Sequence, residues 1–231
     1  MEFAYIQKTS LVDYPGNICS TVFTIGCNFK CPFCYNKSLV LPEEFPRNPL
    51  TEEQVLSTLI KRKKFVSAVC ITGGEPTMYD ELYNFIKSLK NEGFLVKLDT
   101  NGTNPKIIKK LIENKLVDYI AMDIKNSFEN YTLTTGVDTN TDNIQETIKI
   151  LKNSDLEYEL RITIVPSIHK IEDIEKIGMV SGGNNFSIQI FKRTNTLIDS
   201  SLVNVAPFSQ NELSMFKKTA EKYFSKVELK G

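Results

Sequence analysis

The sequence of 231 residues predicts an α/β fold, built as a single domain around a parallel β-sheet. From residue 18 onward, apolar runs rich in β-branched residues alternate with amphipathic helical patterns. Six strand–helix units in succession favour parallel strands joined by right-handed crossovers. No linker, low-complexity stretch or short repeat interrupts the pattern. Either an open doubly wound sheet or an incomplete barrel satisfies these observations.

The individual elements follow from local signals. Thr51 followed by Gln54 forms a capping box that opens a helix, while Gly93 and Pro166 end a helix and a strand. The predicted strands are residues 18–25, 65–72, 94–99, 116–125, 158–165 and 185–191, with a short terminal strand at 226–229. The predicted helices are 51–63, 78–91, 106–114, 142–152, 170–178 and 210–224. Residues 1–17 are an N-terminal extension, 18–191 hold the six units, and 192–231 form a C-terminal loop and helix.

Composition excludes several classes of partner. Lysine plus arginine and aspartate plus glutamate number 28 each, so net charge indicates neither a nucleic acid nor a membrane partner. The basic run at 61–64 follows a predicted helix, where a solvated C-terminus accounts for it. No apolar run approaches the roughly 20 residues of a membrane span, and the first ten residues lack the features of a signal peptide. We expect a cytoplasmic protein with reduced thiols.

Unusual residues cluster where the predicted strands end. The cysteine-rich loop follows the first strand, and the segments TGGEP, DTNG, MDIK and VPS follow the next four. In both candidate architectures, ligands gather at the C-terminal ends of the strands. The sequence therefore predicts one mouth lined by five strand ends.

The stretch GCNFKCPFCYN places Cys27, Cys31 and Cys34 in one loop with the spacing C-x3-C-x2-C. A 4Fe–4S cluster usually takes one thiolate on each of its irons, so three cysteines would leave one iron open for a ligand. Three thiols in one polar loop of a reduced protein favour this cluster.

Two alternatives to a cluster stay open for these cysteines. Zinc would need a fourth ligand, for which Cys19 and His169 are the candidates, although Cys19 lies in a predicted strand and His169 is distant in sequence. Three unconnected thiols are the simpler alternative. Cys19 and Cys70 are predicted to be small buried residues of strands, and His169 receives no role.

Ionisable residues also face the predicted barrel interior. Alternation along 94–99 puts Lys97 and Asp99 on the inner face, where they must pair or bind a ligand. Asp123 ends the fourth strand with Lys125 just beyond it, and a local ion pair is the simplest interpretation. Arg161 lies on one face of the fifth strand, either as a rim residue that extends to solvent or as a ligand contact.

The motif CNFKCPFC resembles the cluster motif of the radical S-adenosylmethionine (SAM) superfamily. The longer stretch SLVDYPGNICSTVFTIGCNFKCPFCYN, together with ITGGEP, KLDTNG and YIAMDIK, resembles the glycyl-radical-enzyme activases. Within these, the match is closest to the full-length barrel subgroup of anaerobic ribonucleoside-triphosphate reductase activating proteins. The resemblance is densest over residues 7–126 and implies an incomplete (β/α)6 TIM-type barrel.

The resemblance also implies a chemistry. The open iron would bind SAM, and one electron from the reduced cluster would cleave it to methionine and a 5′-deoxyadenosyl radical. That radical would remove a hydrogen atom from a glycine Cα of a glycyl radical enzyme, with a flavodoxin- or ferredoxin-type protein as electron donor. The cofactors carry the difficult chemistry, so no general base is needed.

Site residues carry over position by position. Cys27, Cys31 and Cys34 would bind the cluster, and Asp123 and Lys125 would lie at the reacting centre. Asp99, Thr100, Met122 and Asp123 match positions that hold a monovalent cation near the cofactor. Tyr35 departs from the histidine of many activases. The residues expected to bind SAM are Phe33, Tyr35, Gly73, Gly74, Glu75, Asp99, Thr100, Asp123 and Arg161.

Two further functions compete with the activase. One is a radical SAM enzyme that acts on a small molecule or another peptide, and the other is a non-catalytic iron–sulfur or zinc-binding module. Residues 37–64 contain no cysteine, so the ferredoxin-like insert of some activases is absent here. The polar loop 192–209 is expected to border the mouth and to meet the partner protein.

Overall fold

The computed structural model describes all residues, 1–231, as one nine-stranded sheet with helices around it. The strand order is β3-β1-β2-β4-β5-β6-β7-β8-β9, and every pair from β2 to β9 is parallel. The strands are β1 (Glu2–Ser10), β2 (Cys19–Thr24), β3 (Leu50–Thr51), β4 (Ala68–Gly73), β5 (Leu95–Thr100), β6 (Tyr119–Asp123), β7 (Glu157–Ile164), β8 (Gly183–Ile190) and β9 (Phe224–Lys230). Because β3 and β9 each have one neighbour, the sheet is an incomplete barrel.

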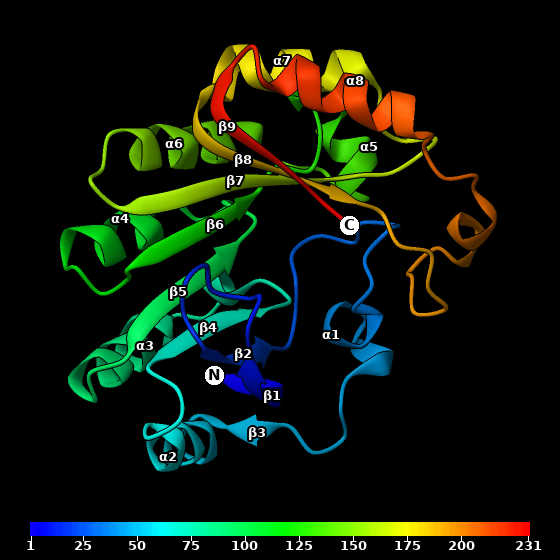
Figure 1. Ribbon diagram of the computed structural model, residues 1–231. Coiled ribbons are helices and arrows are strands. Elements are labelled where there is room, and N and C mark those ends of the chain that lie inside the picture. Colours follow the sequence, from blue (N-terminus) through cyan, green and yellow to red (C-terminus); the bar gives the residue numbers. More distant parts are fainter.

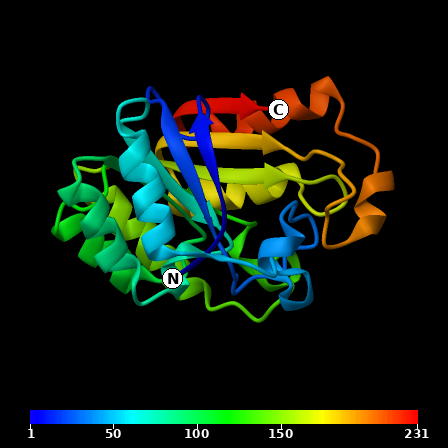
Figure 2. The same cartoon turned by 90° about the horizontal axis from the view of Figure 1, so that it is seen from below.

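The helices are α1 (Lys37–Val40), α2 (Glu52–Arg62), α3 (Leu82–Asn91), α4 (Pro105–Glu113), α5 (Tyr131–Thr135), α6 (Thr141–Lys152), α7 (Ile171–Ser181) and α8 (Gln210–Ala220). Six of them, α2, α3, α4, α6, α7 and α8, cover the outer, convex side of the curved sheet, whereas α1 and α5 lie beside the loop that follows β2 (Figure 1). In Figure 2 the arrowheads of β7 and β8 point toward the side where α1 and the segment after β8 lie. None of the helices has the length and apolar character needed to span a bilayer.

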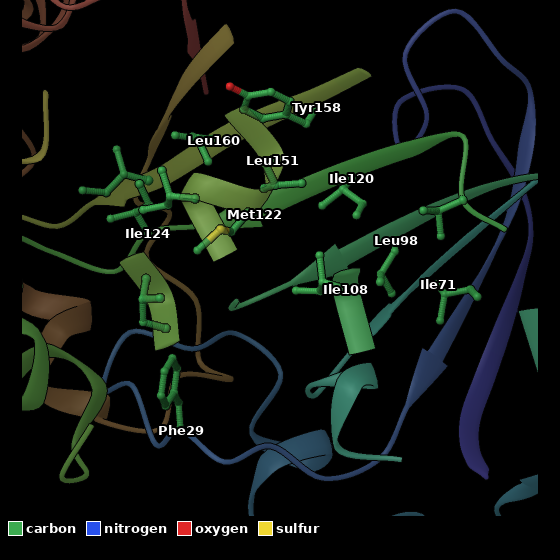
Figure 3. Packing of buried hydrophobic residues seen from close by; sticks show 14 of the residues in the cluster. Phe29, Ile71, Leu98, Ile108, Ile120, Met122, Ile124, Leu151, Tyr158 and Leu160 are labelled. Atoms are coloured by element: carbon green, nitrogen blue, oxygen red, sulfur yellow. The ribbon is translucent and has the colours of Figure 1, made fainter. Parts of the chain in front are cut away.

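The main core lies between the outer face of the sheet and these helices. Neighbouring strands contribute Ile71, Leu98, Ile120, Met122 and Leu160, which pack toward Ile108 of α4 and Leu151 of α6 (Figure 3). Since side chains alternate along a strand, the residues between them face the barrel interior. Apolar burial on the outer face thus directs polar side chains inward.

The connection between β1 and β2 lies in the barrel interior, toward the N-terminal ends of the parallel strands. Tyr14 in this connection lies with its ring centroid 5.9 Å from that of Tyr119. Cys19 and Cys70 belong to the same small buried cluster, which confirms that both are buried strand residues. Tyr14 therefore covers part of the interior near the N-terminal ends of the strands, and the interior is open at their C-terminal ends.

The predicted strand–helix alternation is confirmed, with differences at the ends of the chain. The capping box of Thr51 and Gln54 is present at the start of α2. The predicted helix 78–91 begins only at Leu82, after a 3-10 turn over Pro76–Met78. The predicted helix 210–224 ends at Ala220, because Phe224 already begins β9.

Five elements exceed the prediction: helices α1 and α5, strands β1 and β3, and the longer terminal strand β9. Residues 1–17 contain β1, which pairs antiparallel with β2 and β3. The terminal strand is longer than 226–229 and adds a seventh parallel strand beside β8. Helix α5 was not predicted, since a threonine-rich segment of five residues has little helical propensity of its own.

Candidate active site at the mouth of the barrel

The cysteine loop leaves β2 and is held by backbone contacts to two neighbouring segments. Gly26 N–H donates to the Leu39 carbonyl (2.8 Å), and Lys30 N–H donates to the Thr135 carbonyl at the end of α5 (2.8 Å). The unpredicted helix α5 thus anchors the middle of the loop. Phe29 packs edge-on against buried Tyr131 of α5, with ring centroids 6.3 Å apart, and lies at the edge of the core (Figure 3).

One pocket at the mouth gathers most of the residues that the resemblance singled out. Its lining includes Cys27, Cys31, Phe33, Cys34, Tyr35, Gly73, Gly74, Glu75, Asp99, Thr100, Asp123 and Lys125. Arg161 lines an adjacent groove on the inner face of the sheet rather than this pocket. Tyr35 and Asp99 line both hollows, so the groove continues from the pocket.

The three thiols lie in a buried setting with one cation close by. Burial raises the pKa of Cys27 to about 12 and that of Cys31 to about 11, and it raises the pKa of Cys34 as well. The positive charge of Lys125 acts in the opposite direction on all three thiols. Metal binding therefore has to displace protons here, and Lys125 favours the thiolates that result.

The donor set fits a multinuclear cluster better than a single ion. No three His, Cys, Asp or Glu side chains come close enough together to hold one metal ion. Cys19 lies at the far end of β2, buried among Tyr14 and Ala68, and cannot complete a zinc site. In a 4Fe–4S cluster each thiolate meets a different iron, so the ligands stand farther apart than around one ion.

His169, the other candidate zinc ligand, is occupied by the backbone. Its Nδ1 accepts from Val165 N–H (3.0 Å), so its Nε2 carries the proton and donates to the Lys125 carbonyl (2.7 Å). Burial lowers its pKa, and the ring stays neutral. Tyr131 Oη accepts from Lys125 N–H (3.2 Å), so the backbone of Lys125 is held on both sides. His169, which received no role from the sequence, helps to position Lys125.

The two glycines after β4 let the strand end approach the start of the cysteine loop. A Cβ on Gly74 would lie 1.8 Å from the Gly26 carbonyl oxygen, and one on Gly73, whose φ is +122°, would lie 2.4 Å from Thr24 N. The chain's own backbone makes a close approach here, with Glu75 N–H donating to the Gly26 carbonyl (2.8 Å). Both glycines also line the pocket, as expected of residues that meet a ligand.

Glu75 is buried and its carboxylate is fully engaged within the chain. Oε1 accepts from Thr77 N–H (3.0 Å), Thr77 Oγ1 (2.5 Å) and Thr100 Oγ1 (2.7 Å). Oε2 accepts from Asn101 N–H (2.6 Å). Burial raises the pKa of Glu75, whereas these donors act to lower it. The side chain joins the turns after β4 and β5, both of which line the pocket.

A chain of buried charges crosses the ends of β5, β6 and β7. Lys97 pairs with Asp99, and Lys125 pairs with Asp123 (3.2 Å), which confirms the predicted local ion pair. Arg161 links the two carboxylates, with Nε 2.7 Å from Asp123 and one terminal nitrogen 3.1 Å from Asp99. Burial alone would raise the pKa of both aspartates, but Arg161 and the two lysines lower it, so both stay ionised.

Met122 is the strand partner of Thr100 and precedes Asp123, but its side chain points away from the other residues of the expected cation site. Its side chain is buried in the outer core and packs against Gly102 (Figure 3). This follows from alternation, since Asp123 next to it faces inward. Thr100 lines the pocket, but its hydroxyl donates to Glu75.

Tyr35 connects the cysteine loop to the segment 192–209. Its hydroxyl accepts from Lys192 N–H (2.7 Å), and its ring lies nearly parallel to Phe191 with centroids 6.1 Å apart. Within the segment, Ile198 N–H donates to the Cys34 carbonyl (3.2 Å) and Asp199 N–H to the Pro32 carbonyl (2.9 Å). The segment thus borders the mouth and packs onto the cysteine loop.

Sequence reasoning missed five polar residues of the pocket: Asn36, Thr72, Asn101, Thr163 and Gln189. Thr163 Oγ1 donates to Gln189 Oε1 (3.1 Å) across β7 and β8. Strand alternation could have identified two of them, because it places Thr163 on the same face as Arg161 and Gln189 between two apolar residues. Asn101 follows Thr100 directly in the turn after β5.

Comparison with known proteins decides the family. Residues 21–177 match the model of the radical SAM superfamily. This chain belongs to that superfamily. The matched region runs from β2 into α7, so it includes the cysteine loop and the ends of β4 to β7.

Two relatives from Methanocaldococcus jannaschii are similar over most of their length. Both are provisionally named glycyl-radical enzyme activating enzymes. One is 33% identical over 97% of this chain and 94% of its own length, and the other is 27% identical over 90% and 78%.

Solved structures share the fold. Streptococcus suis SuiB bound to its precursor peptide SuiA matches with a TM-score of 0.69 at 15% identity. The match covers 91% of this chain and 48% of SuiB, so this chain spans about half the length of SuiB. The structure of anSMEcpe with bound AdoMet matches with a TM-score of 0.63 at 17% identity, over 89% of this chain and 62% of that one.

Membership of the radical SAM superfamily fixes the enzyme class and the cofactors. The chain is a radical SAM enzyme that uses a 4Fe–4S cluster and SAM. The fold places the three thiols and the polar ends of β4 to β6 around one pocket. That arrangement suits a cluster and a zwitterionic ligand held side by side.

Proposed function

We propose that this radical SAM enzyme is a glycyl-radical-enzyme activase and that its partner is an anaerobic ribonucleoside-triphosphate reductase. The observation that carries the activase proposal is the 33% identity to a provisionally named activating enzyme over 97% of this chain and 94% of the relative. The resemblance of the motifs from Ser10 to Lys125 to the reductase-activating subgroup supports the choice of partner. A flavodoxin- or ferredoxin-type protein is the proposed electron donor.

The chain's own residues have distinct tasks in this proposal. Cys27, Cys31 and Cys34 hold the cluster, and Lys125 offsets the negative charge of their thiolates. The aromatic ring of Phe33, buried beside Cys34, offers a surface for the adenine. When bound, the reduced cluster supplies one electron that cleaves SAM to methionine and a 5′-deoxyadenosyl group, which then takes one hydrogen atom from the partner's glycine.

The decisive experiment is anaerobic reconstitution followed by electron paramagnetic resonance. The reconstituted chain is mixed with reductant, SAM and the purified reductase, and a glycyl radical signal on the reductase is expected. Pyruvate formate-lyase serves as the comparison partner. Formation of 5′-deoxyadenosine without a radical on any glycyl radical enzyme would instead support a radical SAM enzyme with another substrate. Absence of both products would contradict the activase and leave only a non-catalytic role.

The segment 192–209 provides a test of where the partner docks. Deleting it would disturb the cysteine loop, because Ile198 and Asp199 are hydrogen bonded to that loop. We therefore choose its exposed residues and expect the double substitution Arg193→Glu and Thr196→Glu to slow partner activation about fivefold or more by charge mismatch. Uncoupled formation of 5′-deoxyadenosine should stay unchanged.

A substitution far from the mouth is the matched control. Lys61→Glu, on the exposed face of α2, reverses a surface charge as Arg193→Glu does and should affect neither rate. Equal loss of partner activation and uncoupled cleavage in the double variant would contradict docking at this segment.

A further inference from the structure

The charge network at the ends of β5, β6 and β7 gives every carboxylate oxygen of Asp99 and Asp123 a partner within the chain. Each of the four carboxylate oxygens already faces a nitrogen of the chain. Asp99 Oδ1 meets Lys97 and Oδ2 meets Arg161, while Asp123 Oδ1 meets Arg161 and Oδ2 meets Lys125. The expected ligands of a monovalent cation are thus occupied by the chain itself.

Charge balance points the same way. Two carboxylates, Asp99 and Asp123, are matched by three cations, Lys97, Lys125 and Arg161. Glu159 is the other acidic group near Arg161, but its carboxylate binds Lys230 (3.0 Å) and Ser187 (2.7 Å). Lys125 also faces the cysteine thiols, while Lys97 and Arg161 alone already match the two carboxylates. A bound Na⁺ or K⁺ would therefore be surplus positive charge in a partly buried site, where unbalanced charge is costly.

Arg161 has the geometry to replace such an ion. Its guanidinium lies between the two carboxylates and donates to both from a planar, permanently charged group. Its side chain is 12% exposed, so it is held in place rather than free in solvent. It lines the groove that continues from the cysteine pocket, together with Asp99.

We propose that Arg161 is a positioning residue that serves as the built-in counter-cation of Asp99 and Asp123, in place of a monovalent metal ion. SAM binding by this chain is then independent of Na⁺ and K⁺. The guanidinium holds Asp99 and Asp123 in fixed positions on the pocket wall. This inference depends on the chain being a radical SAM enzyme but not on which partner it activates.

The test measures SAM affinity by equilibrium dialysis and the thermal stability of the metal-free chain. Both are measured in NaCl, KCl and choline chloride at one ionic strength. For the unaltered chain we expect the same SAM affinity and the same midpoint of thermal unfolding in all three salts. A gain of about tenfold in affinity in KCl or NaCl over choline chloride, the size of one charge-assisted contact, would overturn the proposal. This arm of the test needs no variant.

Variants then assign the effect to Arg161. Arg161→Gln removes the charge and should bind SAM about tenfold more weakly in choline chloride, with recovery in NaCl or KCl. Arg161→Lys keeps the charge, so its SAM affinity should be the same in all three salts. Glu159→Gln removes a neighbouring charge two residues earlier on the same face of β7. Its SAM affinity should also be the same in all three salts. If the Arg161→Gln variant folds but regains no SAM affinity in NaCl or KCl, the proposal that Arg161 takes the place of a metal ion is contradicted.

Discussion

Replacing Cys31 by alanine is expected to lower the iron and sulfide retained after anaerobic reconstitution by about tenfold or more, because a three-thiolate site cannot hold the cluster with one ligand removed. Cys31 is buried at 6% exposure, lies in the loop held by α5, and shares one pocket with Cys27 and Cys34. Loss of the cluster also removes the open iron at which SAM binds. Iron and sulfide assays and the visible absorption of the reconstituted chain measure the effect.

Cys19→Ala is the matched control for this substitution. Cys19 is fully buried, has the same side chain and belongs to a different cluster in the lower barrel. Its loss should cost about 1 kcal/mol of stability and leave the iron content unchanged. If Cys31→Ala retains as much iron as the parent, or Cys19→Ala loses it as completely, the assignment of the cluster ligands is wrong.

Replacing Glu75 by alanine is expected to destabilise the fold by about 2 to 5 kcal/mol, because it leaves several buried donors without an acceptor. These donors are the backbone N–H groups of Thr77 and Asn101 and the hydroxyl of Thr100. Glu75 joins the turns after β4 and β5, so its loss loosens two walls of the pocket together. Urea denaturation of the metal-free chain measures the change in the free energy of unfolding.

Two further substitutions make this result specific. Glu75→Gln keeps one accepting oxygen but sets an amide N–H against the Asn101 N–H, so an intermediate loss is expected. Glu113→Ala removes an exposed carboxylate 3.9 Å from Lys109 and should cost less than about 0.5 kcal/mol. If Glu75→Gln keeps the stability of the parent but loses SAM binding, Glu75 meets the ligand directly and its role as a link between turns is wrong.

Features of the fold and of the site could be predicted from the sequence where the local pattern and the tertiary structure agree. Alternation in 94–99 placed Lys97 and Asp99 inward, where they pair, with Lys97 buried and the side chain of Asp99 14% exposed. The capping box of Thr51 and Gln54 located the start of α2 within one residue. Strand ends predicted which loops share a mouth, because the C-terminal ends of parallel strands always lie at the same edge.

Other features depend on contacts distant in sequence. In β1, Phe3 is buried while Glu2, Tyr5 and Gln7 are exposed, so no apolar face marks it as a strand. It is stabilised by pairing with β2 and β3, which local propensity does not report. Arg161 could be placed on a face of its strand, but its two partners lie 38 and 62 residues away. The inward face was predictable from the sequence and the charge network was not.

The order of the strands has a consequence for synthesis of the protein. From β2 to β9 each new parallel strand is added beside the preceding one, so the sheet can grow in one direction as the chain leaves the ribosome. The thiols of Cys31 and Cys34 emerge early, but the segment that hydrogen bonds to their loop at Ile198 and Asp199 follows about 160 residues later. At usual translation speeds this interval lasts about 8 to 30 seconds. The contacts that cover the cysteine loop can therefore form only after β8 has been synthesised.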